Sequence, residues 1–129
     1  MEYFGPHWTA EARGVSPEKI KDQKLIEDFM RELVRVAEMK IISGPYVFYY
    51  EHPESEIESG VTGFLVLAES HCSVHSFIND GFLALDLFSC KEFNNALIDK
   101  LVLDTFAPEG YTSEVRWRGE GYERSKAKY

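Results

Sequence analysis

The segment VTGFLVLA, residues 61–68, is an almost unbroken apolar run, and the segment ESHCSVHSF, residues 69–77, follows it directly. A short continuous apolar run is typical of a strand buried in a sheet. Residues 73–77 and 82–88 carry two further strand patterns around Asn79-Asp80-Gly81, and Asp-Gly is a common hairpin signal. Together these segments predict the antiparallel centre of a sheet.

Further strands are expected over residues 3–12, 41–50 and 111–118. Ser16-Pro17-Glu18 supplies an N-cap, a proline at the first helical position and an acidic first turn, which predicts a helix running to about Met39. A second helix is marked by apolar residues at helical spacing, namely Phe93, Leu97, Leu101 and Val102. The expected fold is α/β (α+β): a two-layer α/β sandwich with a mainly antiparallel sheet and helices on one face.

Length and charge restrict the possible functions. A chain of 129 residues, numbered 1–129, is expected to form one domain. Its net charge of -8 argues against nucleic acid or an anionic membrane as partner and suits a cationic ligand. No apolar run approaches the roughly 20 residues that span a bilayer, and two cysteines are too few for a disulfide framework. We therefore expect a soluble, cytoplasmic protein.

Residues 69–75 bring a hydroxyl and two imidazoles together, and a thiol follows at Cys90. Such groups suggest covalent chemistry. Histidine and cysteine side chains also bind zinc, and the region contains His71, Cys72, His75 and Cys90. Strand alternation, however, places Cys72 on the face opposite His71, Ser73 and His75. Paired Cys-x-x-Cys motifs are missing as well, so no metal site is expected. His7 and Asp86 are interpreted as structural.

The same region resembles a known family, the short prokaryotic type of pyruvoyl-dependent S-adenosylmethionine decarboxylase. The matching positions are Glu69-Ser70-His71, His75, Phe77, Gly81-Phe82 and Asp86-Leu87-Phe88-Ser89-Cys90. Their spacing fits without gaps from about Thr62 to Cys90, and the order of elements agrees across nearly the whole chain.

The resemblance implies self-cleavage of the chain. The Ser70 hydroxyl would attack the carbonyl of Glu69, and elimination would then separate fragment 1–69 from fragment 70–129. Residue 70 would become a pyruvoyl group. In that comparison His75 is the base that removes the Cα proton of residue 70, a task that suits an imidazole. Thr62 stands where the family has a serine that holds the processing intermediate.

The resemblance also implies what the cleaved protein does. The pyruvoyl group would form a Schiff base with the amino group of a small amino-acid-type substrate and accept electrons as CO2 leaves, without a dissociable cofactor. Cys90 would then protonate the α-carbon. This is the chemistry of a decarboxylase of polyamine (spermidine) biosynthesis, and relatives imply a homodimer with active sites built from both protomers.

Substrate identity is less defined. Phe77 keeps one aromatic wall for adenine, but Glu56 replaces the family's stacking aromatic residue and Asn79 replaces the glutamate that binds the ribose. An unpaired glutamate would favour a guanidinium or ammonium group, so arginine or ornithine is an alternative to S-adenosylmethionine. The acidic loop around Glu56 has an equally simple explanation as a solvated turn. A third alternative is an unprocessed, non-catalytic regulatory homologue.

Overall fold

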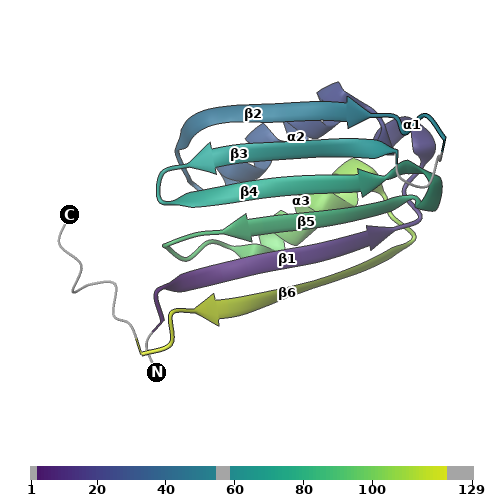
Figure 1. Ribbon diagram of the computed structural model, residues 1–129. Coiled ribbons are helices and arrows are strands. Elements are labelled where there is room, and N and C mark those ends of the chain that lie inside the picture. Colours follow the sequence, from purple (N-terminus) through teal and green to yellow (C-terminus); the bar gives the residue numbers. More distant parts are fainter. Residues whose placement is uncertain (1–2, 55–58, 122–129) are drawn as a thin grey trace.

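The computed structural model describes residues 3–54 and 59–121, which form one sheet with helices on one side (Figure 1). The elements are β1 (Gly5–Arg13), α1 (Pro17–Ile20), α2 (Gln23–Val36), β2 (Ile41–Tyr50), β3 (Gly60–Leu67), β4 (Ser70–Phe77), η2 (Ile78–Asp80), β5 (Phe82–Phe88), α3 (Asn95–Phe106) and β6 (Gly110–Arg118). All five strand pairings are antiparallel, in the order β2-β3-β4-β5-β1-β6. The predicted two-layer fold is confirmed. Within the described ranges, no helix has the length and apolar character that crossing a membrane requires.

The two long helices lie behind the sheet in Figure 1, and no helix of the described residues lies on the opposite face. We call this second face the open face. Alternation along the strands sends large apolar side chains such as Trp8, Leu65 and Leu87 into the core under the helices. Residues of the other parity lie on the open face: His7, Thr9, Glu11, Thr62, Phe64, His71, Ser73, His75, Phe77, Ala84, Asp86 and Phe88.

The first helix was predicted to be continuous, and this prediction is wrong. Instead of one helix from residue 16 to 39, the structure has the single turn α1 and then α2, interrupted at Lys21 and Asp22. The Asp22 carboxylate accepts a hydrogen bond from Leu25 N at 3.1 Å, so this residue caps a new helix. A capping side chain competes with helix continuation, and Asp22 therefore begins a second helix inside the range predicted as one.

The second predicted helix is present as α3, and its apolar stripe agrees with the prediction in part. Its buried residues are Ile98, Val102 and Phe106, whereas Leu97 is 50% exposed and Phe93 precedes the helix. Asn94 caps it by accepting from Leu97 N. Val102 is buried as predicted, and Phe93 and Leu101 pack partly buried against the core, so Leu97 is the residue of the predicted stripe that faces solvent.

Turn geometry also differs from the predictions around β4. This strand begins at Ser70 instead of residue 73, because a two-residue turn at Ala68 and Glu69 joins it directly to β3. Between β4 and β5, the predicted Asp-Gly hairpin is a 3₁₀ turn closed by Gly81 at φ 61. Only glycine adopts such a positive φ without strain, so Gly81 still ends the turn.

Cys72 lies in the core between sheet and helices and is 1% exposed. Burial, with a smaller contribution from the nearby Asp86 carboxylate, raises the pKa of its thiol from 9.0 to about 12. The unfolded chain would lose this proton above about pH 9, whereas the folded chain keeps it until about pH 12. Folding stability should therefore fall over this range, by up to about 1.4 kcal/mol per pH unit from this residue.

Urea unfolding at pH 8 and pH 10 tests this expectation. The loss of stability between the two pH values should be smaller in Cys72→Ala than in the unsubstituted chain, although Cys72→Ala is less stable at both. Equal losses would show that this thiol does not stay protonated in the fold.

Candidate active site

Thr62 and His75 form a pair in the middle of the sheet. They are cross-strand neighbours of β3 and β4, and Thr62 Oγ1 lies 2.7 Å from His75 Nδ1. Which of the two donates the hydrogen bond depends on the imidazole tautomer. Both side chains are exposed on the open face, and the Phe77 ring packs edge-on against His75 with centroids 4.8 Å apart. The structure therefore brings two residues to which the resemblance gives separate processing roles into direct contact.

Ser70 lies at the other end of the same strand. It follows the turn at Ala68 and Glu69 and pairs with Leu67, the last residue of β3. Its Oγ is buried and has no hydrogen-bond partner among the described residues. Glu69 has a φ of 63°, in the left-handed region that favours glycine. The Glu69–Ser70 peptide bond therefore joins a residue with a strained backbone to a residue whose hydroxyl has no hydrogen-bond partner among the described residues.

Cys90 lies at this same end of the sheet. His71 pairs with Phe88 on the antiparallel strand β5, so continuing the register brings Ser70 and Ser89 side by side, with Cys90 next. A Cβ on Gly5 would come within 2.1 Å of Ser89 O, so β1 approaches the Cys90 segment as closely as only glycine allows. Cys90 is 6% exposed.

The structure therefore divides the predicted catalytic residues into two groups. Ser70 and His75 are five residues apart on one extended strand, which corresponds to about 16 Å. The family resemblance implies that His75 removes the Cα proton of residue 70, but within a single chain the two residues lie too far apart for this. An imidazole cannot bridge that distance. Thr62 and His75 form one group, and Glu69, Ser70 and Cys90 form the other.

Strand alternation itself was predicted correctly. His71, Ser73 and His75 lie on the open face, while Cys72 is in the core. Cys72 is therefore separated from both histidines by the sheet, as the argument against a four-residue zinc site required.

The two predicted substrate-binding residues that the structure describes, Phe77 and Asn79, lie in different surroundings. Phe77 contacts His75, as described above. Asn79 is exposed on η2, at the end of β4 beyond His75, and lines a separate hollow with Gly14 and Glu109. Glu56 lies outside the described residues.

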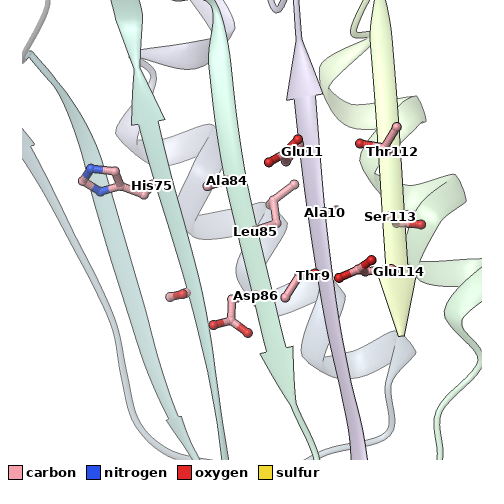
Figure 2. A pocket seen from close by; sticks show the side chains of 11 residues that line it. Thr9, Ala10, Glu11, His75, Ala84, Leu85, Asp86, Thr112, Ser113 and Glu114 are labelled. Carbon is pink, nitrogen blue, oxygen red and sulfur yellow. The ribbon is translucent and has the colours of Figure 1, made fainter. Parts of the chain in front are cut away.

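A hollow of about 490 Å³ lies on the open face beside His75 (Figure 2). Figure 2 shows His75 at one side and Glu11, Asp86 and Glu114 on the strands across from it. Further polar residues of the lining are Thr9, Ser73, Thr112 and Ser113. Three carboxylates in one hollow favour a cationic ligand.

Comparison with known proteins identifies the family. The sequence model described as S-adenosylmethionine decarboxylase matches residues 6–119. The chain belongs to the S-adenosylmethionine decarboxylase family. Its relatives include the S-adenosylmethionine decarboxylase proenzyme of Archaeoglobus fulgidus, 34% identical over 116 residues that cover 89% of this chain and 97% of that protein. The proenzyme of the same name from Thermococcus gammatolerans is 30% identical over 118 residues, which cover 90% and 78% of the two chains.

A solved structure agrees with this assignment to the S-adenosylmethionine decarboxylase family. The crystal structure of the adenosylmethionine decarboxylase from Aquifex aeolicus superposes with a TM-score of 0.75 at 25% identity. The match covers 98% of this chain and all of that chain. The predicted resemblance is confirmed at the level of family and fold.

Sequence reasoning missed one cluster in this family member. His7, His71 and Asp86 approach one another on the open face, although His7 and Asp86 were interpreted as structural. Parity within each strand was readable from the sequence. The pairing of β1 with β5, which joins segments 79 residues apart, was not.

Proposed function

We propose that the chain is the proenzyme of a self-processing S-adenosylmethionine decarboxylase that cleaves itself between Glu69 and Ser70. The observation that supports this most directly is the buried, unpartnered Oγ of Ser70 beside the strained Glu69. A buried hydroxyl without a partner costs free energy, and strained backbone is frequently found at reactive sites. Family membership supplies the reaction that such a bond would undergo.

Cleavage would proceed by rearrangement of the Glu69–Ser70 peptide bond. Attack of Ser70 Oγ on the Glu69 carbonyl forms an ester, breaks the C–N bond and leaves a free amino group on residue 70. A base then removes the Cα proton of residue 70, and the Cβ–Oγ bond of the ester breaks. This step releases fragment 1–69 with a terminal carboxylate and leaves dehydroalanine at residue 70. Tautomerisation and hydrolysis by one water release ammonia and leave a pyruvoyl group on fragment 70–129.

The residues around Ser70 fit a pyruvoyl group at this position. The Oγ atom that must be lost is not engaged in the hydrogen-bond network, so its removal breaks no contact among the described residues. A pyruvoyl carbonyl supplies an electron sink for decarboxylation of an amino acid. Cys90, at the same end of the sheet, is the proposed proton donor to the substrate's α-carbon.

We further propose that the functional unit is a homodimer in which His75 and Thr62 of one protomer act on Ser70 of the other. Within a chain, the base lies about 16 Å from the bond it should process. A two-fold axis near the middle of β4 would exchange the two ends of this strand, because symmetric interfaces pair residue i with j and j with i. The open face also exposes large aromatic side chains: Tyr46, Phe48, Tyr50 and Phe64. Burial of these side chains in a dimer would be favourable.

The proposed substrate is S-adenosylmethionine. The relatives' names favour it over the arginine and ornithine that Glu56 and Asn79 suggested. The acidic hollow beside His75 is compatible with a substrate that carries a sulfonium and an ammonium group. Phe77 offers an aromatic surface next to His75.

Intact-mass analysis and a decarboxylation assay test this function. The freshly expressed protein should convert from 14.9 kDa into two fragments that separate between residues 69 and 70. The processed material should release CO2 from carboxyl-labelled S-adenosylmethionine, and more slowly or not at all from labelled arginine and ornithine. A chain that stays intact would contradict the proposed processing. A processed chain that prefers arginine or ornithine would overturn only the substrate.

Strain at Glu69 leads to a separate prediction. The left-handed conformation costs a residue with a Cβ about 1–2 kcal/mol, which glycine does not incur. If cleavage relieves this strain, Glu69→Gly should be cleaved about 5-fold more slowly than Glu69→Ala. Both variants lose the carboxylate and differ only in the Cβ, so the alanine variant is the matched control. Equal rates of fragment formation, measured by mass spectrometry over time, would mean that strain does not contribute.

A further inference from the structure

Three side chains that have no role in the proposed cleavage converge on the open face. His7, His71 and Asp86 come from the neighbouring strands β1, β4 and β5, and one ligating atom from each lies within 4.8 Å of the other two. His7 Nε2 contacts Asp86 Oδ1 directly. This set differs from the four residues considered from the sequence and includes no cysteine.

Strand register explains the convergence. His7 and His71 both pair with Phe88, one from each side, so they flank it in the same cross-strand row. Asp86 lies two residues earlier on β5 and therefore projects from the same face. The two imidazole rings meet edge-on with centroids 6.3 Å apart. Backbone pairing thus fixes the positions of all three donors before any ligand binds.

The surroundings limit access of water to this cluster. The side chains of His7 and Asp86 are 20% and 32% exposed. Phe64 stacks on the His71 ring at 6.1 Å and 13°, and Phe88 packs against both histidines. A partly desolvated carboxylate beside two imidazoles attracts a cation more strongly than the same groups in open water.

We propose that His7, His71 and Asp86 bind a divalent transition-metal ion of the zinc class. Two imidazole nitrogens and one carboxylate oxygen are typical ligands for Zn²⁺ and Co²⁺, whereas Mg²⁺ and Ca²⁺ prefer sites made of oxygen alone. The ion replaces the direct His7–Asp86 contact, and water occupies its remaining coordination position. It joins three strands at the end of the sheet that carries Ser70 and Cys90, and therefore stabilises that end.

Arg118 provides a further test of the proposed metal site, because it lies against His7. Its Nη1 donates to His7 Nδ1 at 3.4 Å, and its guanidinium lies 4.9 Å from the centroid of the Phe88 ring. A histidine that binds metal through Nε2 normally carries a proton on Nδ1 and donates it to an acceptor. Arg118 presents a donor and a positive charge there instead, so it opposes metal binding. Removing this group should strengthen binding.

Titration of the metal-free full-length protein with Co²⁺ tests the site, with Zn²⁺ competition as a second readout. We expect one ion per chain, visible d–d absorption and a rise in melting temperature, since a ligand that binds only the folded state stabilises it. Affinity should fall at least about 10-fold in His71→Gln and in Asp86→Asn. It should be retained in His52→Gln, a matched control whose histidine lies outside the cluster. Arg118→Gln should bind more tightly than the unsubstituted chain.

Circular dichroism identifies any variant that fails to fold, in which case His7→Gln replaces it. The proposal is overturned if the unsubstituted protein shows no saturable binding, or if folded His71→Gln and Asp86→Asn bind as it does. Weaker binding in Arg118→Gln would contradict metal ligation by His7. The same titration on Ser70→Ala, which cannot form a pyruvoyl group, separates this site from the proposed function. Ion binding is expected in this variant, because the metal site requires no processing.

Discussion

Replacing Ser70 by alanine is expected to leave the chain intact at 14.9 kDa and to abolish decarboxylation. Alanine lacks the only atom that can attack the Glu69 carbonyl in the proposed rearrangement, so no ester forms and no pyruvoyl carbonyl appears. Loss of a covalent catalytic group typically lowers turnover by about 10⁴-fold or more. Because Ser70 Oγ has no hydrogen-bond partner among the described residues, the substitution should not destabilise the fold.

Ser73→Ala is the matched control for this experiment. Ser73 lies on the same strand, but it faces the open side in the middle of β4, three residues from the proposed cleavage site. Intact-mass spectra should show two fragments for Ser73→Ala and one chain for Ser70→Ala. Borohydride in the presence of substrate should trap an adduct on fragment 70–129 of the unsubstituted protein and none on Ser70→Ala. Cleavage of Ser70→Ala at the same bond would refute the assigned nucleophile.

The fold could be predicted wherever local patterns determined it. The apolar run at 61–68 and residues 82–88 became the strands β3 and β5 that their patterns predicted, although the unbroken run did not reveal that Phe64 would be 43% exposed on the open face. The first helix was misjudged because Asp22 lies inside the range predicted as one helix, from Ser16 to about Met39, and caps a new helix there. A single capping hydrogen bond decided between one helix and two, and periodicity does not detect such a bond.

The site could be predicted in composition but not in arrangement. Placing the hairpin turn at Ala68 and Glu69 makes Leu67 pair with Ser70 and then Thr62 with His75, so their contact follows once the turn is known. The start of β4 was predicted three residues too late, so this turn was not recognised. The distance from Ser70 to His75 was available from the rise of a strand, since five extended residues span about 16 Å. The prediction considered only which face of the sheet each residue occupies, and it therefore overlooked this distance.

Co-expression of Ser70→Ala with His75→Ala is expected to restore cleavage that neither variant shows alone. In the proposed homodimer, a mixed pair has one site with Ser70 from the His75→Ala chain and His75 from the Ser70→Ala chain. That site is complete, whereas the second site lacks both residues. Random pairing puts roughly half of the His75→Ala chains in mixed dimers, so about that fraction should be cleaved. A single chain that processed itself would give no cleavage in the mixture.

Mass spectrometry can determine which chain is cut, because position 75 lies within fragment 70–129. The released fragment should carry the His75→Ala substitution, and the Ser70→Ala chain should remain whole. Co-expression of His75→Ala with the double variant Ser70→Ala/His75→Ala is the control, since no protomer then supplies the imidazole. Fragments that appear in this control would show that His75 is not the base. If instead the original mixture stays uncut while the unsubstituted protein cleaves, the two groups of residues must meet by rearrangement of a single sheet, which the continuous pairing from β3 to β5 opposes.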